Sequence, residues 1–367
     1  MISLIRPQLK HVSFAAFFLS IFFGTHLVGT QAVLAQVTPN ELSRLSLEEL
    51  LGVEIEDITG KKRWMLSYEF RFMDVANYQA GRQKLSFEEV LLSPGETRTN
   101  LNFPIVPTFI KQTAHAFSIG REISNAFSLN MSLPVVTQRT EHISSIADFE
   151  EFEIKTSGIG DIALVGLYKF HRSAASSASV GFGVSFPTGP INNIGDTPRE
   201  GTGTLERLPY TMQIGSGTYD FLASLSFEQD VDNWAFGIKG HTTLRTGLNE
   251  NAYRLGNNYG VELTAKFKGW SSIRPGLHLS LRTTEQITGR DEQLLMPNNA
   301  FPFGATIANP ENYGGEKAKV GGNVRLCIRK SCGLNINLKA AVPIYQNLNG
   351  IQQRERFSFS TAINYSF

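Results

Sequence analysis

The feature that most constrains this chain of 367 residues is a period-two alternation of apolar and polar side chains from Arg63 to the C-terminus. Successive side chains of a β-strand point to opposite faces, so the alternation predicts strands with one apolar and one polar face. In the first such segment the apolar positions are Trp64, Leu66, Tyr68, Phe70 and Phe72. Similar segments recur along the chain and predict about 12 strands.

The connections between these segments alternate between short and long. Tight connections such as Gly120–Asn125 alternate with long polar segments, which include Asp74–Phe103, Arg139–Ser157, Pro187–Gly217 and Thr288–Glu316. Bacterial outer-membrane barrels combine short periplasmic turns with long extracellular loops, and lipid cannot satisfy a free sheet edge. The sequence therefore predicts an all-β transmembrane antiparallel up-and-down barrel over residues 63–367, located in the outer membrane.

A soluble β-sandwich is the alternative fold, because its strands alternate as well. The polar faces carry Lys and Arg, which a packed core could not bury without partners but a wet lumen accepts. The composition agrees with a barrel, since 41% hydrophobic and 18% charged residues average an apolar outer face with a polar inner one. The formal net charge of +1 excludes a general nucleic-acid binder, which needs a strongly basic surface.

The N-terminus has the form of a targeting segment. Residues 1–35 contain two basic residues, an apolar run at Val12–Phe23 and small residues before Gln36, which predicts a signal peptide. The apolar run is shorter than the roughly 20 residues of a membrane-spanning helix, so we expect export rather than anchoring. Residues 36–62 are expected to form a periplasmic linker or a short helix, with leucines at helical spacing around Ser46–Leu51.

The polar faces of the predicted strands carry more basic than acidic side chains. Basic rings in pores favour anions, so we predict a lumen that favours small anionic solutes. The predicted pore-lining residues are Arg71, Lys239, His241, Arg245, Lys266, Arg274, His278, Arg282, Arg325 and Lys339. Among them, Arg245, Arg274 and Arg282 are the predicted constriction.

The last segment is rich in outward-facing aromatic residues and resembles the C-terminal signal by which outer-membrane barrels are inserted. The residues of this predicted signal are Phe357, Phe359, Ile363, Tyr365 and Phe367. The expected partners are therefore the barrel-assembly machinery, outer-membrane lipid and lipopolysaccharide, and a small-molecule solute; the oligomeric state stays open.

Cys327 and Cys332 could close a disulfide loop in an oxidising compartment, and two cysteines alone do not make a zinc site. We predict no metal site and no cofactor.

Six short blocks, in this order, resemble an uncharacterised bacterial outer-membrane barrel family called "transporter", related to the phenol-degradation-pathway (MetA) barrel family. The blocks are YEFRFM at 68–73, SGIGD at 157–161, FPTG at 186–189, LPYTMQIGSGTYD at 208–220, YRLG at 253–256 and PIYQNLNG at 343–350. The resemblance implies a barrel with a transport role and supplies no substrate. The segment LSLEELLGVEIEDI also resembles the stem that precedes the plug of TonB-dependent receptors, but no full plug follows it.

Motifs for catalysis are weak in this chain. Gly158–Ala163 matches a dinucleotide-binding pattern, but no helix pattern follows, so glycines that bend a strand are the simpler interpretation. His278 and Ser280 lie on the predicted lumen face rather than the lipid face that an outer-membrane lipid hydrolase uses. We therefore expect no enzyme. Two functions stay open: a channel for passive or facilitated passage of small, anionic or aromatic solutes, and a plugged structural or surface-interaction barrel.

Overall fold

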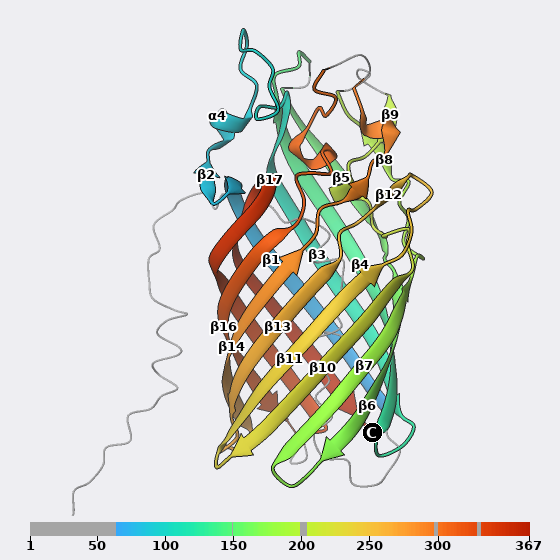
Figure 1. Ribbon diagram of the computed structural model, residues 1–367, viewed down its shortest axis with the longest axis vertical. Helices are drawn as coiled ribbons and strands as arrows, with labels where there is room; N and C mark the ends of the chain where they lie inside the picture. The colour runs from blue at the N-terminus through green and yellow to red at the C-terminus, as the bar shows by residue number, and fades with distance from the viewer. Residues whose placement is uncertain (1–63, 149, 199–203, 297–299, 329–331) are drawn as a thin grey trace, which may run out of the picture. The chain divides into compact units, whose positions relative to one another are not determined.

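The computed structural model describes residues 64–367 except 149, 199–203, 297–299 and 329–331. The predicted signal peptide, residues 1–35, and the predicted linker, residues 36–62, lie outside the described residues. Strands dominate the described part of the chain (Figure 1). Among these residues, no helix is long and apolar enough to cross a membrane.

Eleven strand elements form a closed ring in which each strand is antiparallel to its neighbours in chain order (Figure 1). They are β1 (Trp64–Gly81), β3 (Ile105–Glu122), β4 (Phe127–Ser144), β6 (Ile162–Arg172), β7 (Ser176–Phe186), β10 (Asp220–Val231), β11 (Trp234–Arg245), β13 (Asn258–Phe267), β14 (Ile273–Thr284), β16 (Gly315–Cys327) and β17 (Leu334–Ser366).

The ring closes through β17, which is 33 residues long. Its first part pairs with β16 through Asn335–Leu348, and its last part pairs with β1 through Leu348–Ser366. The two ends of β17 lie side by side, since the Ser366 N–H donates to the Gly333 carbonyl over 2.7 Å. Because β17 contributes two passes to the wall, the ring agrees with the expected strand number, and the predicted transmembrane barrel is confirmed.

The short elements gather at one end of the ring, which we call the loop end (Figure 1). They are β2 (Gln83–Leu85), α4 (Phe87–Val90), β5 (Glu151–Ile159), β8 (Ile194–Asp196), β9 (Leu205–Arg207), β12 (Tyr253–Arg254) and β15 (Thr288–Gly289), with the 3-10 helices η1 (Tyr210–Met212), η2 (Glu292–Leu294) and η3 (Thr306–Ala308). The opposite end, the turn end, carries the short connections and the C-terminus.

Several strands continue beyond the bounds that the sequence predicts. The segments Asp74–Phe103 and Arg139–Ser157 were expected to be loops, but β1 reaches Gly81 and β4 reaches Ser144. β5 pairs with the loop-end half of β4, and β6 pairs with the other half, so both belong to one wall strand that is interrupted at residues 160–161. In the β4 extension polar residues occupy both faces, with Gln138 and Thr140 inside and Arg139 and Glu141 outside. A segment without an apolar face looks like a loop in the sequence.

The outer face of the ring is apolar. Outward side chains such as Phe117, Phe182 and Leu225 are half or more exposed. Near the turn end, the Trp234 ring lies 5.3 Å from Phe267, and Phe267 lies 5.2 Å from Trp270. An apolar band with an aromatic girdle at its edge is typical of a barrel that spans a membrane.

The two chain ends of the ring meet at one seam. The Trp64 N–H donates to the Phe367 carbonyl over 2.9 Å, and the Phe367 N–H donates to the Trp64 carbonyl over 3.0 Å. The predicted insertion-signal residues lie along this seam: Phe357, Phe359, Ile363 and Tyr365 are opposite Asp74, Phe72, Tyr68 and Leu66, respectively. At the turn between β16 and β17, Cys327 and Cys332 form a disulfide.

Candidate functional site

The inner wall of the ring is lined by ion pairs, some of which join strands that are not adjacent in the sheet. Lys266 Nζ lies 3.0 Å from Glu228 Oε2, and Lys339 Nζ lies 3.1 Å from both oxygens of Glu262. Arg71 forms a bidentate pair with Glu69 on the same strand, at 3.0 and 2.9 Å. Taking charges out of water is expensive, so their number along this wall indicates a polar lumen rather than a packed apolar core.

Four of the predicted pore-lining residues meet at one cavity in the lumen wall, with a volume of about 80 Å³. These are Arg71, His278, Arg282 and Lys339. They come from β1, β14 and β17, and the intervening strand β16 adds Lys319 to the same lining. We call this space the lumen cavity.

The other predicted pore-lining residues do not line this cavity. Lys239 is opposite Glu262 in the register of β11 and β13, and His241 is opposite Gly260, two residues nearer the loop end. Lys266 pairs with Glu228 toward the turn end. Arg274 and Arg325 are opposite each other near the turn end.

The three arginines of the predicted constriction do not share one level. Arg274 and Arg282 are eight residues apart on β14, which separates them by roughly 26 Å along the strand. Arg245 ends β11, where it forms a buried ion pair with Asp220 and its Nε donates to the Gly256 carbonyl over 2.9 Å. Arg245 therefore links the ends of β10 and β11 to the loop that contains Gly256, instead of facing Arg274 across the lumen.

The sequence predictions missed Lys317, Lys319 and Glu355. The Glu355 carboxylate is fully buried, with Lys319 Nζ at 2.5 Å and Lys317 Nζ at 3.7 Å. The signal was present in residues 315–323, where Lys317 and Lys319 alternate with Ala318 and Val320. This alternation directly follows a long loop that contains several glycines, so the start of β16 is not recognisable from the sequence pattern.

Two buried histidines of the inner wall pack against glycines of the next strand. His241 covers Gly260, and His278 covers Gly321, each pair being opposite in register. A Cβ at either glycine would overlap the imidazole. These glycines are therefore required so that a large polar side chain fits against the wall.

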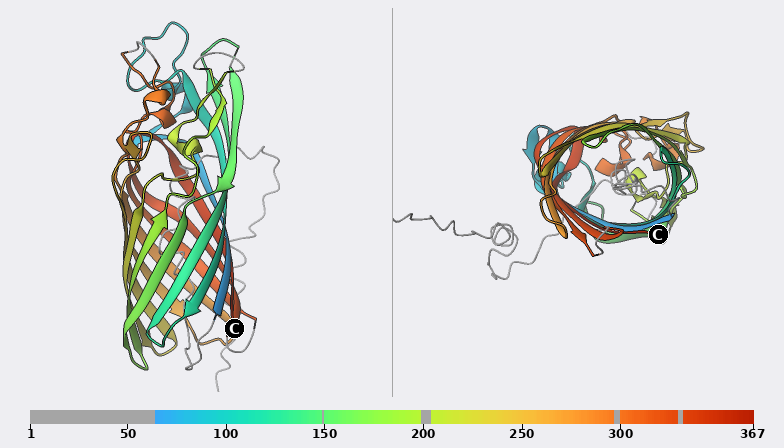
Figure 2. Two further views of the ribbon diagram at one scale, coloured as in Figure 1. Left: turned by 90° about the vertical axis from the view of Figure 1, so that its right-hand side faces the viewer. Right: turned by 90° about the horizontal axis from the view of Figure 1, so that it is seen from below.

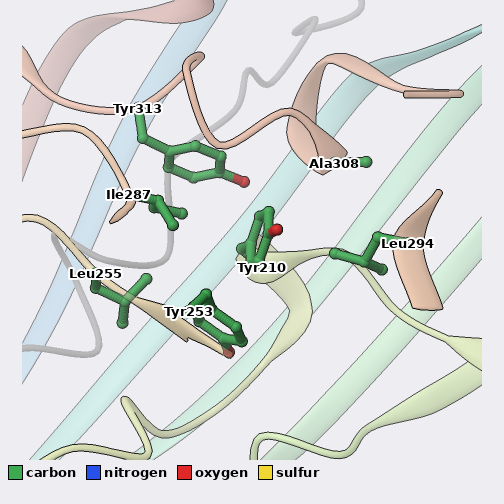
Figure 3. Close-up of a cluster of buried hydrophobic side chains, with 7 residues drawn as sticks. All are labelled: Tyr210, Tyr253, Leu255, Ile287, Leu294, Ala308 and Tyr313. Atoms are coloured by element: carbon green, nitrogen blue, oxygen red, sulfur yellow. The ribbon is translucent and has the colours of Figure 1, made fainter. Parts of the chain in front are cut away.

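The long loops fold together over the loop end of the ring. Seven buried residues from three loops form one apolar cluster (Figure 3): Tyr210, Tyr253, Leu255, Ile287, Leu294, Ala308 and Tyr313. We call the described parts of loops 187–219, 246–257 and 285–314 the cap. Seen from the turn end, segments of the loops lie within the outline of the ring (Figure 2).

Aromatic contacts hold this cluster together. The Tyr210 ring lies 4.7 Å from Tyr253 and 5.8 Å from Tyr313, both near edge-to-face. The Tyr313 hydroxyl donates to the Ile307 carbonyl over 2.6 Å, and the Tyr210 hydroxyl accepts from the Asp291 N–H over 3.0 Å. Burial raises the pKa of Tyr210 to about 12, so the cluster stays neutral at physiological pH.

Asp161 docks the first loop of the cap onto the barrel wall. Its Oδ1 accepts from the Gly189 N–H over 2.9 Å, and its Oδ2 accepts from the Ser216 N–H over 2.8 Å. A Cβ on Gly189 would lie only 2.8 Å from the Gly215 Cα and 3.0 Å from the Gly160 Cα. The glycine motif in residues 158–163 therefore allows three backbones to approach closely, and the blocks SGIGD, FPTG and LPYTMQIGSGTYD meet at this point.

The docked loop reaches the inner face of β4. The Thr140 hydroxyl lies 3.1 Å from Met212 Sδ, and Gln138 Nε2 donates to the Gln213 carbonyl over 3.5 Å. Beside them the buried His142 stacks on Phe152, with ring centroids 4.5 Å apart. Burial lowers the pKa of His142 to about 3, so it is neutral in the folded protein.

Within the described residues, no group of three or more His, Cys, Asp or Glu is placed to hold a metal ion.

No protein-family model matches this sequence, and no curated protein matches it. Among solved structures, the COG4313 outer membrane channel from Pseudomonas putida F1 is similar with a TM-score of 0.53 and 12% identity, over 86% of this chain and 98% of that chain. The NanC porin has a TM-score of 0.41 and 7% identity, over 82% of this chain and 98% of that chain. At such identities the similarity to the COG4313 channel shows that the two chains share the barrel fold, while the resemblance to the MetA-related family and to the TonB-receptor stem is not confirmed.

Proposed function

We propose that this chain is an outer-membrane channel for the passive or facilitated passage of small anionic solutes. The observation that carries the proposal is the charged inner wall, in which Arg and Lys from β1, β14, β16 and β17 meet around one cavity. An apolar outer face makes the ring a membrane-spanning wall, and a charged inner face keeps water in the lumen. A basic lining lowers the energy of an anion there and raises that of a cation.

Further features support the same proposal. The solved COG4313 protein is itself named a channel, and the family that the sequence blocks resemble is called "transporter". Export through residues 1–35, location in the outer membrane and recognition of the C-terminal strand by the barrel-assembly machinery belong to this proposal. We expect no enzymatic activity.

Single-channel recordings in planar bilayers test the proposal. In a salt gradient, the wild type is expected to give discrete conductance steps and a reversal potential that indicates preference for anions. Arg282→Glu places a negative charge in the lumen cavity and is expected to shift the reversal potential toward cation preference. The control is Lys155→Glu, which makes the same charge change at a side chain 66% exposed on the loop-end wall. Cation preference in the wild type would contradict the proposal.

The cap favours a second candidate function, a barrel that its own loops close. Its core of seven buried residues at the loop end packs the three loops against one another. Asp161→Ala removes both hydrogen bonds that dock the first loop and distinguishes the two candidates. A gated channel is expected to conduct more once the cap loosens, whereas a purely structural barrel is expected to stay silent in both forms.

A further inference from the structure

We infer that the lumen cavity is a binding site for one compact oxyanion, of the phosphate or carboxylate kind. The inference rests on the proposed function in one respect, since the anion reaches the cavity through the lumen. It names the chemical group that the channel would recognise.

The lumen cavity is assembled from neighbouring strands at one depth of the wall. Arg71 on β1 is opposite Ser360, and Met73 is opposite Ser358, both on the last pass of β17. Ser280 on β14 lies between Glu262 of β13 and Lys319 of β16 in the register. These side chains all share the inward face of their strands, so their polar ends converge on the same space.

The charge around the cavity is positive on balance. Four cations line it, namely Arg71, Arg282, Lys319 and Lys339, and one carboxylate, Glu262, lines it as well. Glu69 pairs with Arg71, and Glu355 pairs with Lys317 and Lys319. The excess of cations over carboxylates along the lining favours a bound anion electrostatically.

Hydrogen-bond donors complete the site. His278 is 4% exposed, and its Nδ1 has no hydrogen-bond partner among the described residues. The hydroxyls of Ser280, Ser358 and Ser360 line the same space. A buried polar atom without a partner is rare in native proteins, and an oxyanion supplies acceptors for several such donors at once.

The volume limits the ligand. About 80 Å³ holds two or three water molecules at about 30 Å³ each, or one phosphate or carboxylate group, whereas a cavity that binds benzene measures about 150 Å³. The site therefore recognises the anionic group of a solute, and an aromatic ring attached to it would have to remain in the open lumen. This favours anionic over aromatic solutes as the recognised class.

Calorimetric titration of the exported, detergent-purified protein tests the site with inorganic phosphate, acetate and benzoate as probes. Saturable binding of phosphate or acetate is expected, with benzoate bound no more tightly than acetate. Arg282→Gln is expected to weaken phosphate binding about tenfold, and Ser360→Ala, a smaller change with less risk to folding, about threefold. Arg325→Gln is the matched control, since Arg325 faces the lumen on β16 outside the cavity.

The outcomes separate the site from the proposed function. Phosphate binding by a protein without conductance would retain the site and reject the channel. Anion-selective conductance without saturable binding of phosphate or acetate would retain the channel and overturn the site. Equal weakening by Arg282→Gln and Arg325→Gln would also overturn the site, because it would indicate a general effect of lumen charge.

Discussion

At the scale of single residues, the inner wall combines large polar side chains with glycines that make room for them. His241 lies against Gly260, and the three atoms nearest to a Cβ added at that glycine all belong to the His241 ring. The first obstacle to a side chain at this position is therefore the His241 ring. Packing of this kind is as specific as a hydrophobic contact, because an added methyl group forces a neighbour to move.

We predict that Gly260→Ala lowers the free energy of unfolding by about 1–3 kcal/mol, because the new methyl group displaces the His241 ring. His241→Ala in the same chain is expected to restore most of this loss. Gly240→Ala on the neighbouring strand is the control, since no atom lies within 4 Å of a Cβ there. The measurement is the urea midpoint at which the heat-modifiable band is lost on gels; equal effects of both alanines would contradict the prediction.

At the scale of elements, the loop end of the barrel depends on contacts between loops and strands rather than on lipid. The outer face of β4 changes from apolar residues such as Leu129 to Arg139 and Glu141, so this part of the strand lies beyond the apolar band. Its inner face is covered by the cap, through Gln138 and Thr140. Cap and strand extensions therefore stabilise each other.

We predict that Asp161→Ala exposes residues 187–217 to proteases while the ring stays folded. The two backbone N–H groups that Asp161 binds lose their charged acceptor, and each such bond contributes about 1.5–3 kcal/mol. Limited trypsin digestion followed by mass spectrometry locates the new cleavage sites. Asp230→Ala, which removes the pair with Lys268 at the turn end, is expected to leave the digestion pattern unchanged.

The buried His142 makes the loop end sensitive to acid. Its pKa is about 3 when folded and 6.5 in the unfolded reference state, so the unfolded state binds the proton first as the pH falls. The contribution of neutral His142 to the free energy of unfolding is therefore fully present above pH 6.5. It decreases below that pH, by up to about 3 kcal/mol at pH 4.5. His142→Gln is expected to abolish this loss. Urea midpoints at pH 7 and 4.5 for both proteins test it, and a similar decrease in both would contradict the assignment.

At the scale of the whole molecule, the closed ring sorts the sequence into a lipid side and a lumen side. Leu225 on β10 is 58% exposed to the outside, while its neighbour Ser226 faces the lumen and lies 2.7 Å from the Ser179 hydroxyl. No strand of the ring has a free edge, because β17 pairs with β1. The environment of each side chain is thus set by its parity along the strand.

We predict that Leu225→Arg and Ser226→Arg have opposite outcomes despite being adjacent. An arginine on the lipid face near the middle of the membrane is destabilising by about 2–4 kcal/mol, while the lumen accepts charge. The fraction of heat-modifiable barrel after refolding into lipid vesicles measures the difference. Equal losses for both variants would contradict the assignment of faces.

The sequence allowed the faces of the barrel to be predicted but not the positions of its charges along the lumen. Arg71, His278, Arg282 and Lys339 were predicted as lumen residues from parity, yet their meeting at one cavity depends on the stagger of five strands. Arg274 and Arg282 have the same parity and differ only in depth. Lys319, which lines the cavity, and its partner Glu355 lie beside segments whose alternation is obscured by a loop-like composition.

The sequence by itself determined the barrel, its lipid face and its lumen face, because period-two alternation reports the pleat of a strand one residue at a time. Only the tertiary structure decided which charges share a level and whether the long loops fold inward. Both depend on pairing between residues far apart in the chain, such as Asp161 with Gly189 and Ser216, or Ser280 with Lys319. The alternation within one segment does not specify how that segment pairs with distant ones. The lumen cavity and the cap can therefore be located only in the folded structure.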